Sequence, residues 1–202
     1  MKLLCFSDVH ADVEAIRRVV SRAAQADILI GAGDFANLRR RLDVAISLLS
    51  QSPIPAVLVP GNHESYEELK EACRNWPAAH VLHGSGVEIA GVPFFGLGGG
   101  VPVTPFGSWS YDLTEDEATA LLEPCPAGCV LVSHSPPRGV LDGSSQGRSL
   151  GSTAVQQIIR SRQPRLVVCG HIHEDAGRVL VSGGTPVLNA GPNGVEWDLS
   201  IG

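Results

Sequence analysis

The chain has 202 residues, 44% of them hydrophobic and 18% charged, which is typical of a compact globular protein and excludes a disordered one. A net charge of −6 and the lack of a basic stripe argue against strong nucleic-acid binding. No apolar run reaches the roughly 20 residues that span a bilayer. The five cysteines have no disulfide-framework spacing, and Cys125 and Cys129 fit a turn better than a redox pair. We therefore expect a soluble, cytoplasmic protein with no membrane partner.

Short buried strands alternate with amphipathic helices in the first part of the chain. The pattern predicts strands at residues 2–6, 27–30 and 56–59, and helices at 11–25, 38–49 and 64–73. From residue 79 the pattern changes to a hairpin, a glycine-rich loop and an irregular segment, at 87–95, 96–100 and 101–113. Beyond them we expect a helix that starts at Thr114, a strand at 130–132, a helix at 152–160 and a strand at 166–169. The tail is predicted to form an antiparallel ribbon from 178–181, 186–188 and 195–199.

This order of elements predicts an α/β (α+β) protein. Alternation of strands and helices followed by hairpins favours two stacked mixed β-sheets flanked by helices, a four-layer αββα sandwich. The sequence contains no linker, repeat or low-complexity segment. We therefore expect residues 1–202 to form a single domain.

Side chains that can bind metal follow the ends of five predicted strands. Open α/β sheets place their ligands at the edge where the strands end, so these side chains are expected to meet there. Five of the seven histidines lie at such positions. The residues are Asp8, His10, Asp34, Asn62, His63, His134, His171 and His173.

Imidazole and carboxylate ligands suit borderline divalent cations, and two carboxylates with four imidazoles exceed what one four-coordinate ion uses. Two ions that share a carboxylate would use them all. If the segments are extended, residues two apart point the same way, which would pair Asp8 with His10 and His171 with His173. Glycines 33, 61 and 170 would let the backbone come close to the ions.

The ordered motifs Asp-Val-His, Gly-Asp-Phe-Ala-Asn, Gly-Asn-His-Glu, Ser-His and Gly-His-Ile-His resemble those of the calcineurin-like metallophosphoesterase family. The segments Gly96–Gly100, His134–Pro137, Leu150–Ser152 and Asn189–Pro192 are similar to the small Icc-related prokaryotic branch. The resemblance implies that Asp8, His10 and His173 hold one metal, that Asn62, His134 and His171 hold the second, and that Asp34 bridges them.

The same resemblance implies that His63 is catalytic and binds the substrate phosphate rather than a metal. Arg148 is a further candidate for phosphate binding, and a surface arginine is the alternative. Asn37 departs from the family pattern, in which many relatives have an Asp that supports the site.

The resemblance implies a phosphoesterase that hydrolyses phosphodiester or phosphomonoester bonds by attack of a metal-bridging hydroxide. The expected substrates are small molecules or nucleotides, and the expected cofactors are two divalent ions, Mn first and Fe, Zn, Ni or Co as alternatives. His63 would either protonate the leaving oxygen or only stabilise its charge. A non-catalytic interaction scaffold on the same fold, or a nuclease, remains the alternative. The sequence leaves the oligomeric state open.

Overall fold

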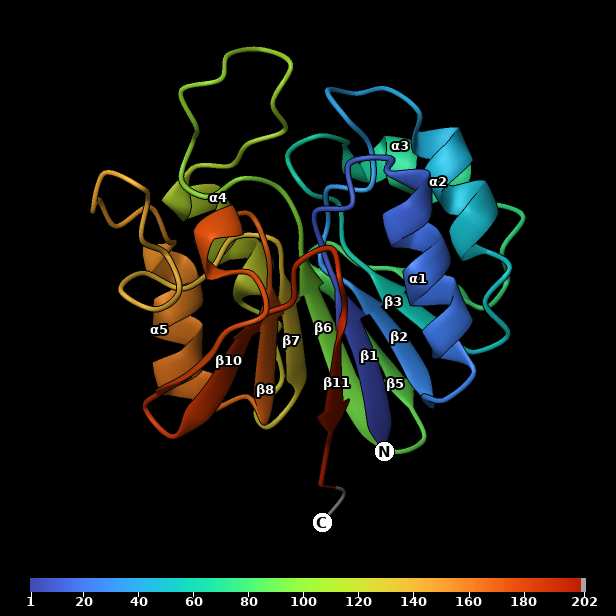
Figure 1. Ribbon diagram of the computed structural model, residues 1–202. Helices are drawn as coiled ribbons and strands as arrows, with labels where there is room; N and C mark the ends of the chain where they lie inside the picture. The colour runs from blue at the N-terminus through green and yellow to red at the C-terminus, as the bar shows by residue number, and fades with distance from the viewer. Residues whose placement is uncertain (201–202) are drawn as a thin grey trace.

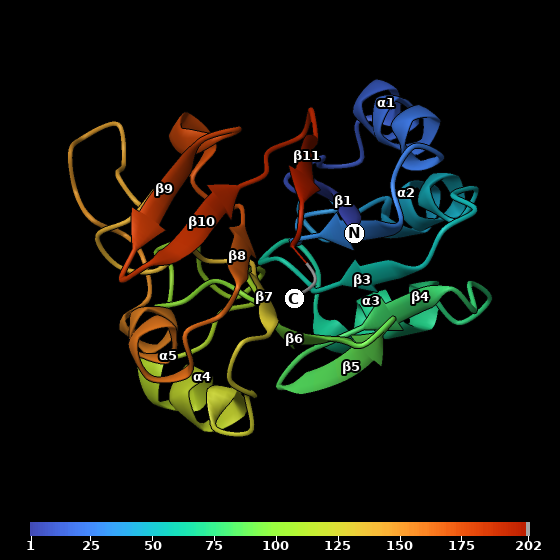
Figure 2. The ribbon, with the colours of Figure 1, turned by 90° about the horizontal axis from the view of Figure 1, so that it is seen from below.

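The computed structural model describes residues 1–200 and places two β-sheets face to face between two layers of helices (Figures 1 and 2). The first sheet has the order β11 (Val195–Asp198), β1 (Lys2–Phe6), β2 (Ile28–Gly31), β3 (Ala56–Leu58) and β4 (Ala79–Val81). The second has the order β5 (Ser85–Ile89), β6 (Val92–Leu97), β7 (Val130–Ser133), β8 (Leu166–Cys169), β10 (Thr185–Asn189) and β9 (Val179–Ser182). Both sheets are mixed, with antiparallel pairs β1–β11, β5–β6 and β9–β10.

Alternation along the strands explains the layers. In β1, Leu3 and Cys5 face the second sheet, whereas Leu4 and Phe6 face the helices that cover the first sheet. The central strands are therefore buried on both faces and read as continuous apolar runs. The αββα sandwich predicted from the sequence is confirmed.

Five α-helices form the outer layers within residues 1–200. The first sheet is covered by α1 (Val13–Ala23), α2 (Leu42–Leu49) and α3 (Tyr66–Ala72), and the second by α4 (Glu115–Leu122) and α5 (Thr153–Arg162). Each of the described helices is too short or too polar to cross a membrane.

Three helices begin later than the apolar pattern predicted, because capping residues or positive φ angles fix where each helix starts. Asp12 accepts hydrogen bonds from the backbone of the first turn, so α1 begins at Val13 and not at residue 11. A capping box between Ser65 and Glu68 starts α3 at Tyr66 instead of residue 64. The predicted helix 38–49 begins only at Leu42, because three residues before it have positive φ: Leu38, Arg39 and Arg41.

The tail differs from the predicted ribbon. Strands β9 and β10 form the expected hairpin, but β11 leaves it and pairs with β1 of the other sheet. The chain crosses between the sheets through the turn at Gly191–Gly194. Strand β4 was not predicted from the sequence, because three half-buried residues give too short a pattern.

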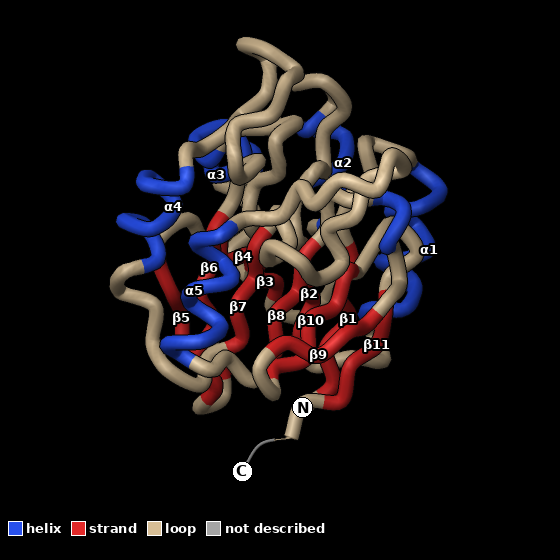
Figure 3. Tube along the Cα trace, turned by 90° about the vertical axis from the view of Figure 1, so that its left-hand side faces the viewer, coloured by secondary structure: helices blue, strands red, loops and turns tan. Residues whose placement is uncertain are grey.

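The parallel strands of the two sheets end at a common edge, where the loops gather (Figures 1 and 3). Backbone hydrogen bonds tie these loops together across the sandwich. Asp8 N–H donates to the carbonyl of Gly33 at 3.0 Å, and Gly170 N–H donates to the carbonyl of His134 at 3.0 Å. The fold thus delivers the ends of distant strands to one place.

Candidate metal centre

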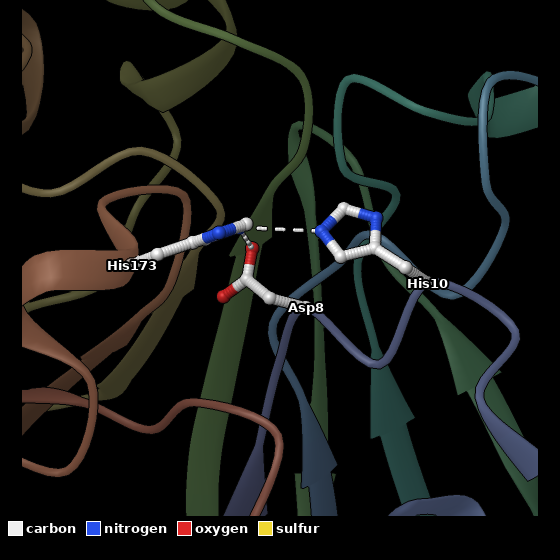
Figure 4. Close-up of side chains that lie close together, drawn as sticks. All are labelled: Asp8, His10 and His173. Carbon is white, nitrogen blue, oxygen red and sulfur yellow. Dashed lines mark hydrogen bonds and ion pairs between the residues drawn. The ribbon is translucent and has the colours of Figure 1, made fainter.

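The first predicted ligand set meets at this edge. Nε2 of His10 lies 3.2 Å from Nε2 of His173, and Nε2 of His173 lies 3.7 Å from Oδ1 of Asp8 (Figure 4). These side chains come from the loop after β1 and from the short 3₁₀ helix after β8, His173–Asp175. Residues 163 positions apart therefore face one point in space.

Asp34 occupies the middle of the cluster. Its Oδ2 lies 3.8 Å from Nε2 of both His10 and His63, and its Oδ1 lies 3.5 Å from Nε2 of His134. The side chain is only 3% exposed. One carboxylate thus contacts imidazoles on both of its oxygens, which is the arrangement that a bridging ligand requires.

The second predicted set surrounds His134, whose side chain is fully buried. Its Nε2 lies 3.2 Å from Oδ1 of Asn62, and its ring packs edge-on against that of His171 with centroids 4.9 Å apart. All seven predicted ligands are thereby brought together.

Three overlapping groups of side chains have donor atoms within 4.8 Å of one another, a spacing that a metal ion can bridge. The groups share their carboxylates and one imidazole, so the donors form one continuous cluster. They are Asp8, His10 and His173; His10, Asp34 and His63; and Asp8, Asp34 and His134. The donor set fits two divalent cations.

The backbone reaches this arrangement through turns and not through extended segments. Four of the predicted ligands have left-handed φ angles: 55° at Asp8, 44° at His10, 57° at Asp34 and 68° at His171. Asp and His adopt this region more readily than most residues. The expectation that residues two apart converge because the chain is extended was therefore wrong, although Asp8 and His10 do meet in one group of donors.

At Gly61 and Gly170, the carboxylates of Asp34 and Asp8 occupy the space that a side chain would fill. A Cβ atom at Gly61 would lie 2.0 Å from Oδ1 of Asp34, and one at Gly170 would lie 2.4 Å from Oδ2 of Asp8. Both distances are far below van der Waals contact. We expected these glycines to let the backbone approach the ions. In the structure the backbone approaches the carboxylates of Asp34 and Asp8.

Buried carboxylates accumulate charge at the centre. Burial, and then the charges of Glu64 and Asp8, raise the pKa of Asp34 well above its usual range. Burial opposes ionisation of Asp8 as well, but hydrogen bonding to His173 and the field of His134 hold its pKa below the usual range. Bound cations would compensate this concentration of negative charge.

Four of the imidazoles in the cluster favour the neutral form, which metal binding requires. Burial is the main cause that lowers the pKa of four of them, His10, His63, His134 and His171. The pKa falls to about 4 for His63 and to about 3 for His171. His173 differs from these four in having a raised pKa, because it hydrogen-bonds to Asp8. Neutral imidazoles carry a free lone pair for a cation.

The hydrogen bond at Nδ1 differs between His134 and His63, and it decides whether Nε2 can bind a metal. Nδ1 of His134 faces the carbonyl oxygen of Ala32 at 2.8 Å and must donate to it, which leaves Nε2 free to bind a metal. Nδ1 of His63 instead accepts the backbone N–H of Leu38 at 2.9 Å. The proton of neutral His63 therefore sits on Nε2, where it can be donated but blocks metal binding.

The structure also places residues that the sequence analysis missed. Nδ2 of Asn62 donates to Oγ of Ser110 at 3.0 Å, which turns Oδ1 of Asn62 toward His134. Ser110 in turn donates to Asp112 at 2.8 Å. Nothing local in the sequence marks Ser110, since the two partners lie 48 positions apart.

Glu64 is a second residue that the sequence analysis did not place in the site. Its buried carboxylate accepts the backbone N–H groups of Gly61, Asp34 and Ala36 at 2.7, 2.9 and 2.8 Å. It thereby joins the loop after β2 to the loop after β3. Its position in Gly-Asn-His-Glu was the available signal.

A cavity of about 550 Å³ opens above the cluster and is lined by His10, Asp34, Asn62, His63 and His173. Asn37 is exposed and also lines it. Arg148 is exposed on the loop whose Ser144 and Leu150 line the cavity, but does not line it itself. The role expected for Arg148 stays a prediction.

The fold is similar to that of solved metallophosphatase structures. The solved structure of TT1561 of Thermus thermophilus superposes with a TM-score of 0.77 at 19% identity, covering 95% of this chain and 90% of that one. A dimetal phosphatase from Danio rerio superposes with a TM-score of 0.62 at 14% identity, covering 94% and 86%. Both likenesses concern the fold, which is that of metallophosphatases.

The sequence then gives the family. Residues 1–175 match the profile of the calcineurin-like phosphoesterases, and the chain belongs to that family. It is 28% identical to the human and mouse proteins called metallophosphoesterase domain-containing protein 1, over 94% of this chain. The chain spans 65% of the length of these two relatives.

Proposed function

We propose that this chain is a dinuclear metal-dependent phosphoesterase that hydrolyses phosphodiester or phosphomonoester bonds of small-molecule or nucleotide substrates. The observation that carries the proposal is the position of Asp34, whose two oxygens face different imidazoles at 3.5–3.8 Å. A structural carboxylate buried beside two others would be costly without cations. Membership of the calcineurin-like phosphoesterases supports the same activity.

The predicted ligands form two sets, one for each proposed cation. Asp8, His10 and His173 would hold one cation, and Asn62, His134 and His171 the other, with Asp34 shared. Two divalent cations in these positions supply a Lewis acid for the phosphoryl oxygen and activate water at neutral pH. Mn²⁺ is proposed first, with Fe, Zn, Ni or Co as alternatives, because imidazole and carboxylate donors suit all of them.

His63 acts as a neutral hydrogen-bond donor in this proposal. Protonation of Nδ1 would set two N–H groups against each other, since that atom already accepts the N–H of Leu38. Burial likewise lowers the pKa of His63 to about 4. Of the two roles left open by the sequence, charge stabilisation through Nε2–H is therefore favoured over proton transfer to the leaving oxygen.

Titrating Mn²⁺ into the purified protein and following hydrolysis of bis(p-nitrophenyl) phosphate and p-nitrophenyl phosphate tests this function. We expect two bound ions and turnover that Asp34→Asn abolishes. A protein that takes up no metal and hydrolyses neither ester would instead be a scaffold on the same fold. Turnover of duplex DNA in preference to both esters would favour the nuclease.

A further inference from the structure

The lining of the cavity includes one exposed aromatic residue from the loop between β6 and α4. Phe106 lines the cavity and is 50% exposed, and its ring stacks on Trp109 with centroids 5.6 Å apart and planes 18° apart. Trp109 packs edge-on against His63 with centroids 4.9 Å apart. A row of three rings thus connects Phe106 in the cavity lining with His63, the residue proposed to contact the phosphate.

The loop that carries these rings is fixed at its base. It lies between β6 and α4 and stands above the common edge of the sheets (Figure 1). Asp112 accepts hydrogen bonds from the backbone and hydroxyl groups of Thr104, at 2.9 and 2.7 Å, and from the hydroxyl of Ser110. Tyr111 N–H donates to the carbonyl of Asn62 at 2.9 Å. These hydrogen bonds hold the loop with Phe106 and Trp109 in a fixed position relative to Asn62, a predicted metal ligand.

A second apolar side chain lines the same cavity. Leu150 comes from the loop before α5, lines the cavity and is 39% exposed. Apolar side chains that gather exposed at a polar site are typical of a ligand-binding groove. The lining of the cavity therefore combines the predicted metal ligands with the apolar side chains of Phe106 and Leu150.

We propose that the free face of Phe106, backed by Trp109, binds a planar aromatic group of the substrate, an aryl ring or a nucleobase, while its phosphate lies at the metal centre. The inference rests on the proposed function and names the substrate class of that site. An aromatic group gains from offset stacking beyond the burial of apolar area. Phe106 acts on substrate affinity and not on the chemical step.

Phosphonates test the subsite, because an esterase does not cleave their C–P bond. Benzylphosphonate and cyclohexylmethylphosphonate share the anionic group and differ in having a planar aromatic or a saturated ring. We expect calorimetry on Mn²⁺-loaded protein to show about fivefold tighter binding of benzylphosphonate. Phe106→Leu keeps an apolar wall but should reduce the ratio to about one. Val103→Ala, an exposed residue of the same loop, should leave it unchanged.

Equal affinities in the wild-type protein, or a preference that survives Phe106→Leu, would overturn the subsite. If p-nitrophenyl esters are turned over all the same, the phosphoesterase function stands and only the subsite fails. If benzylphosphonate is preferred but no ester is hydrolysed, the subsite stands and the hydrolytic function fails. Absence of both phosphonate binding and ester turnover would overturn both.

Discussion

The backbone N–H of Leu38 donates to Nδ1 of His63 at 2.9 Å and fixes the proton of this imidazole on Nε2. Asn37, the position where many family members have an Asp, is exposed, and no hydrogen bond joins its side chain to His63 among residues 1–200. A carboxylate at Nδ1 would favour the imidazolium, whereas a backbone donor favours the neutral ring. The hydrogen bond from Leu38 therefore favours the neutral form of His63 in this chain.

His63→Ala should lower kcat for bis(p-nitrophenyl) phosphate about 100-fold, because one positioned donor to the phosphate is lost. Metal content should stay at two ions, since Nε2–H of His63 is not available to a cation. His63→Gln places an amide N–H near the same point and should recover part of the loss. His80→Ala, in β4, is the matched control. Unchanged kcat in His63→Ala would remove this residue from the mechanism.

The pH dependence should separate the two roles of His63. Its pKa is lowered to about 4, so the protonated form is lost as pH rises through that value. The neutral donor is then fully present from about pH 5.5 to 8. His63→Ala should therefore reduce kcat by the same factor across this range in a stopped-time assay. A factor that shrinks as pH rises would identify a proton donor instead.

Ser110→Ala should weaken binding at the second metal position. Loss of its hydroxyl frees the amide of Asn62, which the serine orients at 3.0 Å. Residues that orient a ligand commonly change metal affinity by about 10–100-fold when removed. Ser108→Ala in the same loop is exposed and serves as the control. Equal Mn²⁺ affinities in the two variants, measured by competition with a chelator, would contradict the role of Ser110.

Gly61→Ala should cost about 3 kcal/mol in unfolding free energy, because the added Cβ meets the backbone and carboxylate of Asp34 and neither can move aside cheaply. Metal binding should fall with it. Gly143→Ala meets nothing within 4 Å and should change stability little. Urea denaturation of both metal-free variants measures the difference, and equal midpoints would refute the close approach.

The layers and the meeting of the polar side chains at one edge could be predicted because both depend on order along the chain. Buried runs such as Lys2–Phe6 mark central strands, and the family resemblance assigned the polar residues that follow them. The local geometry could not be predicted in the same way. The left-handed φ of Asp8 and the 3₁₀ turn at His173 come from packing between loops, and the pattern indicated extended chain.

Contacts between distant segments account for the other differences. Ser110 reaches Asn62 only because the loop after β6 folds over the strand edge, and β11 joins β1 because the tail crosses between the sheets. Neither contact has a periodic signal in the sequence. Arg148 was chosen from the sequence because arginine binds phosphate. It lies on a loop that lines the cavity, but it does not line the cavity itself.

Anomalous scattering from crystals grown with Mn²⁺ locates the proposed cations. Two peaks roughly 3.5–4 Å apart are expected, one on each side of Asp34. One peak should lie beside Asp8, His10 and His173, and the other beside Asn62, His134 and His171. A single peak, or peaks that leave the carboxylate of Asp34 without contact, would contradict the dinuclear centre and the hydrolytic function built on it.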